Sequence, residues 1–151
     1  MTVFSSSLLF VVLVTINIFD LRAQRLPDLL TLPLLLFGLA YTIWYDTAAL
    51  PLHAVAALLG FLALWLVATL YRRRRGFDGL GLGDAKLFAA GGAWLGPVFM
   101  APVLLAATLL ALTAVGILQL SGRQLDWQTR LPFGPFLSLA IFGAWCVKIS
   151  T

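Results

Sequence analysis

The sequence predicts an all-α fold: a polytopic membrane bundle of about six transmembrane helices that forms a single domain over residues 1–151. Hydrophobic residues make up 62% of the chain and charged residues only 11%, whereas soluble domains carry about 25% charged residues. The mean hydropathy is +1.01. The apolar residues form long runs between short polar, Pro or Gly breaks. Such runs predict helices, because a helix satisfies its own backbone hydrogen bonds in lipid.

Six apolar runs follow one another, and each is expected to form one helix. They cover residues 3–19, 29–45, 53–71, 85–96, 98–120 and 133–149. The fourth run is short for a bilayer, which needs about 20 residues per helix. Gly96 and Pro97, with Pro102 beyond them, separate the fourth run from the fifth. If that break is only a kink, the chain has five helices.

The Lys and Arg residues predict how the helices are oriented. With six helices, nine of the ten share one side, and only Lys148 lies on the other. The nine are Arg22, Arg25, the four arginines at 72–75, Lys86, Arg123 and Arg130. Because positive loops stay on the cytoplasmic side, this side is expected to face the cytoplasm.

The net charge of +4 does not indicate a nucleic-acid partner, because the basic residues form short clusters between the apolar runs. We interpret the arginines at 72–75 as a topology anchor that contacts anionic membrane lipid. The single cysteine, Cys146, allows no disulfide within the chain and is expected to be a small buried side chain. The only histidine, His53, is expected at the outer membrane interface.

All six acidic residues are aspartates, and two of them stand out. Asp20 directly follows the first apolar run, and Asp84 directly precedes the fourth, on the same basic side of the membrane. Ionisable groups at such depth usually have a function and a partner, and each is the natural partner of the other. In the structural alternative, Asp20 pairs with Arg22 or Arg25 and Asp84 caps the fourth helix. Asp46 is expected to be a solvated loop residue.

The stretch G-L-G-L-G-D, residues 79–84, favours a functional pair. Gly79, Gly81 and Gly83 remove the Cβ atom at alternate positions, so the backbone can run extended and close to another chain. A helix cap needs no such run. A site that clamps an extended peptide does.

Two carboxyl groups brought together cannot both ionise easily, so they share a proton. One can then act as general base on a water molecule while the other protonates the carbonyl oxygen or leaving nitrogen of a peptide. This chemistry needs no metal, no cofactor and no nucleophilic Ser or Cys. This is the chemistry of aspartic proteases.

The sequence resembles the type IV prepilin peptidases, which are GxGD membrane aspartic proteases, in three places. G-L-G-D, residues 81–84, begins the match that continues as A-K-L-F-A-A-G-G-A-W-L-G. The segment I-F-D-L-R-A-Q-R-L-P-D-L-L-T-L-P-L-L carries the pattern of the first family aspartate at Asp20. The third match is L-P-F-G-P-F, residues 131–136. Three matches in the family order cover most of the chain.

The resemblance implies about six helices with both aspartates near the cytoplasmic face of a bacterial or archaeal inner membrane. It implies removal of the short basic leader from type IV prepilins or pseudopilins by cleavage after a glycine. Asp20 and Asp84 would be the catalytic pair, Gly81 and Gly83 would shape the active-site loop, and Lys86 would stabilise charge or orient the substrate. Because the arginines at 72–75 would repel a basic leader, leader contacts fall to acids such as Asp28 or Asp78.

The sequence departs from many family members, which carry an extra cytoplasmic region with paired CxxC motifs for zinc and N-methylation. Here the connection between the first two helices is short and a CxxC motif is absent, because the chain has one cysteine. The resemblance therefore implies a short form, and we expect neither a zinc site nor methyltransferase activity from this sequence.

Three other interpretations remain open. The chain could be a non-catalytic membrane component of a pilus or secretion assembly system, with glycines that serve helix packing. A transporter is less favoured, because none of the predicted helices has an ionisable residue near its middle. A presenilin-like protease that cuts within the bilayer is also less favoured, because Phe19-Asp20 replaces the expected Tyr-Asp pair.

Overall fold

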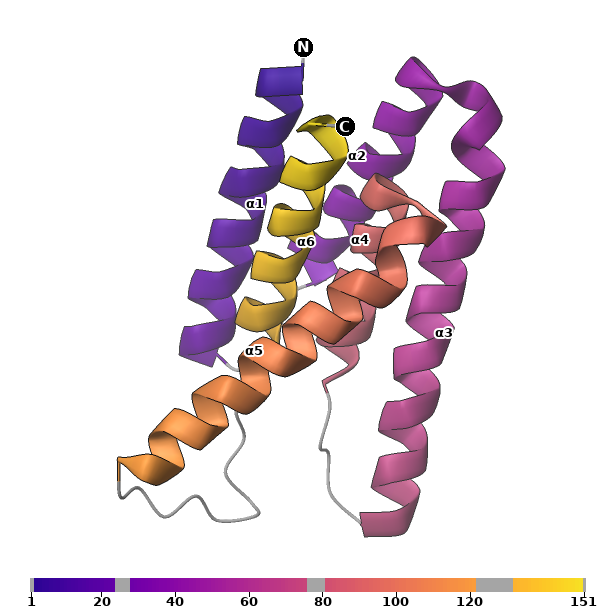
Figure 1. Cartoon of the computed structure of the whole chain (residues 1–151). Helices are drawn as coiled ribbons and strands as arrows, with labels where there is room; N and C mark the ends of the chain where they lie inside the picture. The colour runs from indigo at the N-terminus through magenta and orange to yellow at the C-terminus, as the bar shows by residue number, and fades with distance from the viewer. Residues whose placement is uncertain (1, 24–27, 76–80, 122–131, 151) are drawn as a thin grey trace.

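The computed structural model shows a bundle of helices that run up and down (Figure 1). It describes residues 2–23, 28–75, 81–121 and 132–150. These residues form six α-helices and two short 3-10 helices, and no strand occurs among them. The α-helices are α1 (Thr2–Ala23), α2 (Asp28–Tyr45), α3 (Leu50–Arg75), α4 (Leu82–Leu95), α5 (Met100–Leu120) and α6 (Gly134–Ser150). The predicted all-α bundle of six helices is confirmed.

The break between α4 and α5 separates two helices, so the five-helix alternative is wrong. Gly96 follows α4 with a φ of 81°, a conformation that glycine adopts without steric cost. Pro97 then starts a 3-10 helix, η2 (Pro97–Phe99), which leads into α5. α5 leaves at an oblique angle across the front of the bundle (Figure 1).

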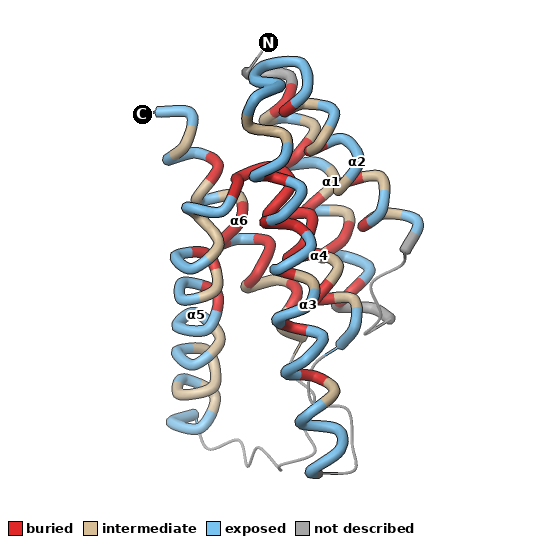
Figure 2. The backbone as a smooth tube through the Cα atoms, turned by 90° about the vertical axis from the view of Figure 1, so that its right-hand side faces the viewer, coloured by how far each residue is buried: buried red, intermediate tan, exposed pale blue. Residues whose placement is uncertain are grey.

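The outer surface of the bundle is apolar, as expected for a membrane protein. Two helical segments, Thr47–Arg74 and Pro97–Leu120, are long and apolar enough to cross a membrane, and three of the other helices are apolar but shorter. Figure 2 shows that the exposed residues of α3 and α5 face away from the bundle. Large apolar side chains such as Leu105 and Leu112 of α5 are among them. Lipid is a suitable solvent for such a surface.

Helix α4 forms the centre of the bundle. It packs against α2, α3 and α6, and nearly all of its residues from Asp84 onward are buried (Figure 2). Small residues allow this close approach. A Cβ atom on Gly92 would lie 2.8 Å from the backbone carbon of Ala56 in α3, and one on Gly38 of α2 would lie 2.6 Å from Trp94. The run of Ala and Gly in α4 therefore lets three helices surround it.

The C-terminal end of α4 is capped by side chains from other helices. The last carbonyl groups of a helix have no partner within it. Nδ1 of His53 lies 2.8 Å from the carbonyl oxygen of Ala93. Nζ of Lys148 donates to the carbonyl oxygens of Trp94 at 2.9 Å and Leu95 at 3.2 Å. A cation at this end also favours the helix dipole.

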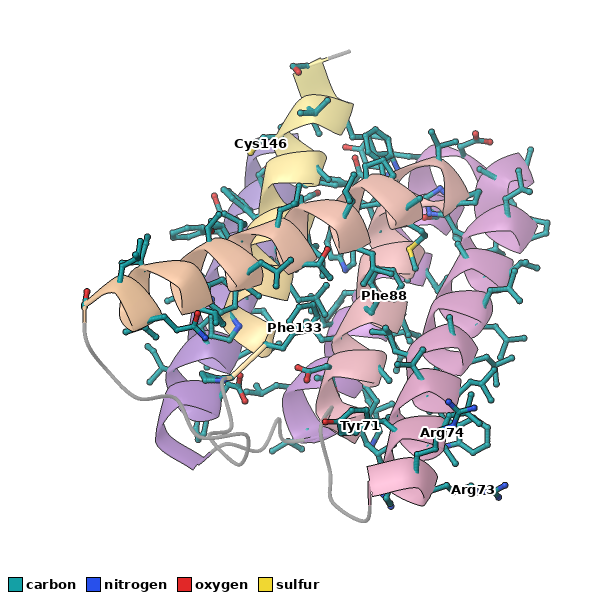
Figure 3. The ribbon with its side chains drawn as sticks, turned by 60° about the horizontal axis from the view of Figure 1, so that its bottom comes forward. Tyr71, Arg73, Arg74, Phe88, Phe133 and Cys146 are labelled. Carbon is teal, nitrogen blue, oxygen red and sulfur yellow. The ribbon has the colours of Figure 1, made fainter. Side chains whose placement is uncertain are left out.

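His53 lies near the start of α3 and is buried, because its Nδ1 meets the carbonyl oxygen of Ala93 at the end of α4. Its place at the membrane interface stays a prediction. The expectation of a buried Cys146 was wrong. Cys146 is exposed on α6 (Figure 3). The buried face of α6 carries Leu137, Ile141 and Trp145. The residue after Trp145 is turned about 100° away from that face.

Replacing the capping lysine should destabilise the bundle. Lys148→Met removes two hydrogen bonds to the end of α4, and we expect the free energy of unfolding in detergent to fall by roughly 2 kcal/mol. Thermal or denaturant unfolding would measure this. Arg73→Met is the matched control, because it removes one positive charge from the exposed end of α3. Equal effects of the two variants would contradict the capping role.

Candidate active site

The end of α1 and the start of α4, which carry Asp20 and Asp84, lie toward the same end of the bundle (Figure 1). Asp20 is three residues before the end of α1, and Asp84 is in the first turn of α4. Their exposed fractions are 6% and 7%. Aspartates are almost never this buried unless they have partners, so both side chains need a structural or chemical reason.

The two carboxyl groups converge on Gly134, the first residue of α6. A Cβ atom on Gly134 would lie 2.5 Å from Oδ2 of Asp20 and 3.5 Å from Oδ1 of Asp84. The backbone N–H of Gly134 also donates a hydrogen bond to the Asp20 carboxylate. Both carboxyl groups therefore border the space that a side chain at this position would fill.

Helix α6 sets the distance between the two aspartates. It packs against both α1 and α4, whereas α1 and α4 make few direct contacts among the described residues. The start of α6 is well defined, because the amides of Phe136 and Leu137 both donate to the carbonyl oxygen of Phe133 at 3.1 Å. Phe133 packs against the hydrophobic core that contains Phe88 of α4. The entry of α6 is thereby anchored beside the aspartates.

Asp84 also contacts the residue that begins α4. Gly81 is the N-cap, with an extended backbone at φ −72° and ψ 141°. Its N–H donates to the Asp84 carboxylate, and the Asp84 N–H donates to the Gly81 carbonyl oxygen at 3.1 Å. The alternative in which Asp84 is itself the N-cap is wrong, because α4 begins at Leu82.

The predicted active-site loop is only partly a loop. Gly81 is extended, but Gly83 lies inside α4, so the prediction that Gly83 shapes a loop was wrong. Lys86 lies inside α4, as the fourth apolar run predicted. Since α4 starts early, the first turn of the helix, rather than an extended strand, presents Asp84. Lys86 is two residues from Asp84, and residues at that spacing do not share a helix face. Gly79 and Asp78 lie outside the described residues.

The electrostatic surroundings of the pair oppose full ionisation. Asp84 lies at the loop end of α4, outside the helical segments that are long and apolar enough to cross a membrane. Its pKa is raised from 3.8 to about 7, mainly because the carboxyl group is buried and then because the charge of Asp20 is close. The hydrogen bond from Gly81 acts in the opposite direction.

Asp20 retains an oxygen that is available to a ligand or a shared proton. Its Oδ2 is buried and has no hydrogen-bond partner among the residues that the structure describes. Arg25, one of its proposed ion-pair partners, lies outside those residues, and the side chain of Arg22 is not described. The arrangement can therefore keep one carboxyl group protonated beside the other and offer a free oxygen to a water molecule.

Gly134 is the site residue to which sequence reasoning gave no role. Its segment, L-P-F-G-P-F, was noted only as a family match. The local signal is that Gly134 lies between Pro132 and Pro135, just before an apolar run. That signal does not say which side chains fill the space beside the glycine.

Comparison with known proteins identifies the family. The model of the type IV leader peptidase family matches residues 7–117, a span that includes both Asp20 and Asp84. The chain belongs to this family. Gly134 lies beyond the matched residues. No solved structure matches the chain.

Several curated relatives carry the name prepilin leader peptidase/N-methyltransferase. The protein from Burkholderia pseudomallei is 40% identical over 126 residues, which are 83% of this chain and 40% of the relative. The protein from Xanthomonas campestris pv. campestris is 37% identical over 139 residues, 91% of this chain and 47% of the relative. The one from Pseudomonas aeruginosa is 36% identical over 128 residues, 85% and 44% of the two chains. The chain thus spans less than half the length of these relatives.

A side chain at position 134 should disrupt the pair of aspartates. In Gly134→Ala the added methyl group would lie 2.5 Å from Asp20 Oδ2, so the Asp20 carboxyl group must move away from Gly134. We expect peptidase activity to fall about 100-fold or more, since displacements near 1 Å have effects of that size. Gly143→Ala on the same helix is the matched control, because a Cβ atom there meets nothing within 4 Å. Wild-type activity in Gly134→Ala would show that the pair does not meet at Gly134.

Proposed function

We propose that this protein is an aspartic endopeptidase that removes the short basic leader of a type IV prepilin or pseudopilin. Cleavage would follow a glycine at the cytoplasmic edge of a bacterial or archaeal inner membrane. The observation that carries the proposal is the convergence of two buried carboxyl groups, Asp20 and Asp84, on Gly134. The family match and the names of the curated relatives support a prepilin as the substrate.

The two aspartates have different roles in the proposed reaction. Asp84 acts as the acid, because its pKa is raised to about 7 and a substantial fraction of it is therefore protonated near neutral pH. Asp20 acts as the base, because its Oδ2 borders the space beside Gly134 and has no partner among the described residues. Asp20 takes a proton from water as the oxygen adds to the scissile carbonyl carbon, while Asp84 protonates the carbonyl oxygen.

Breakdown of the resulting diol completes the reaction. Asp20 passes its proton to the leaving nitrogen as the C–N bond breaks, and Asp84 recovers its proton from a diol hydroxyl. Both residues return to their starting states, so the pair needs no metal and no cofactor in this mechanism.

The position of the pair suits a substrate that lies partly in the membrane. A pilin precursor has its basic leader in the cytoplasm and its hydrophobic helix in the bilayer, so its scissile bond would lie at the level of the bundle end that carries Asp20 and Asp84. Orientation with this end in the cytoplasm follows from the positive-inside rule. Arg73 and Arg74 extend from the same end, at the end of α3 and away from the bundle (Figure 3), as contacts with anionic lipid would require.

We propose that acidic residues such as Asp28 or Asp78 contact the basic leader. Asp28 begins α2, but its side chain is not described, and Asp78 lies outside the described residues.

A non-catalytic assembly component is not favoured, because helix packing alone gives no reason to bury two carboxyl groups against one glycine. We propose no methyltransferase activity for this chain, since its one cysteine cannot form the paired CxxC motifs.

Removing either carboxylate should abolish leader cleavage. In co-expression with a prepilin that has a basic leader and a Gly-Phe junction, Asp20→Asn and Asp84→Asn should each reduce cleavage about 100- to 10,000-fold. The mass of the pilin reports the product. Asp46→Asn is the control: Asp46 is exposed and caps a 3-10 helix through Oδ1, which accepts from the Ala48 amide at 3.1 Å. Asn can keep that cap. Full cleavage by either site variant would remove the proposed mechanism.

The rate of leader cleavage should fall as the pH rises above neutrality. Below about pH 7 Asp84 holds its proton, and above it the proton is lost. Because the reaction needs that proton, kcat should fall about tenfold for each pH unit above the apparent pKa of the pair. A pH profile of purified protein in detergent would test this. A rate that rises steadily from pH 7 to pH 9 would contradict the assignment of the acid.

A further inference from the structure

Polar contacts join helices α1 and α6 at several levels. At one end the Gly134 amide donates to the Asp20 carboxylate. Further along, Oγ of Ser138 donates to Oδ1 of Asn17 at 2.6 Å. At the other end, Nε1 of Trp145 donates to Oγ of Ser6 at 3.0 Å. Polar contacts therefore join the two helices near the aspartates and at the opposite end.

The Asn17–Ser138 contact lies one helical turn from the aspartate contact. Asn17 is three residues before Asp20 on α1, and Ser138 is four residues after Gly134 on α6. Residues at these spacings share a helix face. The two hydrogen bonds thus form neighbouring links between the same two helices. Neither Asn17 nor Ser138 is used by the proposed chemistry.

The Ser138 hydroxyl is buried, with an exposed fraction of 1%. Its other possible acceptor is the carbonyl oxygen of Pro135, in its own helix, at 3.0 Å. The bond to Asn17 is the shorter of the two and the only one that joins different helices. In an interior of low dielectric such a bond is strong and its loss is costly.

A hydrogen bond can fix the position of α1 relative to α6, which apolar packing alone leaves adjustable. The surrounding contacts between α1 and α6 come from side chains such as Ile16 and Leu137, and these tolerate small sliding or rotation of one helix on the other. A hydrogen bond requires a defined distance and angle. Since α1 makes few direct contacts with α4, its position on α6 determines where Asp20 lies relative to Asp84.

We propose that Asn17 and Ser138 are positioning residues, whose hydrogen bond holds Asp20 against Gly134 in the geometry that the reaction needs. This inference rests on the proposed peptidase function. Neither side chain contacts the substrate in this view, so their loss should affect the chemical step rather than substrate binding.

The first test compares kinetics of leader cleavage in purified protein. Ser138→Ala and Asn17→Ala should each lower kcat roughly 10- to 100-fold and leave KM within about twofold. The double variant should be no worse than the single ones, because both remove one bond. Ser138→Thr keeps the hydroxyl and should restore most of the rate.

Ser6→Ala is the matched control. It removes the Trp145 contact between the same helices at the end far from the aspartates, and kcat should stay within about twofold of wild type. If Ser6→Ala loses as much kcat as Ser138→Ala, the Asn17–Ser138 bond serves only general stability. If folded Ser138→Ala and Asn17→Ala both keep the wild-type kcat, the positioning role is wrong.

A second measurement does not depend on activity. Hydrogen exchange of the Gly134 amide, followed by NMR of protein labelled with 15N-glycine in detergent, reports its bond to Asp20. Exchange should be about fivefold faster or more in Ser138→Ala and Asn17→Ala, and unchanged in Ser6→Ala. Unchanged exchange in all three would overturn the proposal. If wild-type protein cleaves no prepilin, the proposed function fails, and exchange still decides whether the bond positions Asp20.

Discussion

The absence of a side chain at Gly134 is the constraint on which the rest of the site depends. Two carboxyl groups from helices that hardly touch each other meet at the start of a third helix. Any Cβ atom there would occupy their shared space. The same residue offers an unpaired helix-terminal N–H to Asp20. One backbone position therefore supplies both the room and part of the stabilisation for the pair.

The central helix explains why the charged groups lie where they do. α4 has 14 residues, so at about 1.5 Å per residue it is shorter than the hydrocarbon core of a bilayer. Both of its ends must therefore find polar partners inside the protein. At the N-terminal end Asp84 bonds with Gly81, and at the C-terminal end Lys148 and His53 reach the last carbonyl groups. A short helix thus creates a buried polar end where chemistry can occur.

Much of the fold followed from local patterns in the sequence. Apolar runs predicted all six helices, and Gly96 with Pro97 predicted the break between α4 and α5. Asp20 and Asp84 stood out because aspartates at the ends of apolar runs are costly, and the structure places both beside Gly134. These signals lie within single segments of the chain, so no tertiary information was needed.

The remaining features depend on which helices meet. The role of Gly134 requires three helices to converge, and the caps formed by His53 and Lys148 require α4 to end within the bundle. The alternate glycines were interpreted as extended backbone, but Gly83 is helical because α4 starts at Leu82. Cys146 is exposed because it follows Trp145, which lies on the buried face of α6, and therefore points away from that face. None of these outcomes is visible in a local pattern.

The central claim is that Asp20 and Asp84 face each other across one small space, and thiol cross-linking tests it most directly. Cysteines would replace both aspartates in a Cys146→Ala background, which is suitable because Cys146 is exposed, and a short bifunctional thiol reagent would be added in native membranes. Cysteines at 20 and 46 provide the comparison, since Asp46 lies at the other end of the bundle. We expect rapid cross-linking of 20 with 84 and none of 20 with 46. Failure of the 20–84 pair to cross-link faster than the comparison pair would contradict the site.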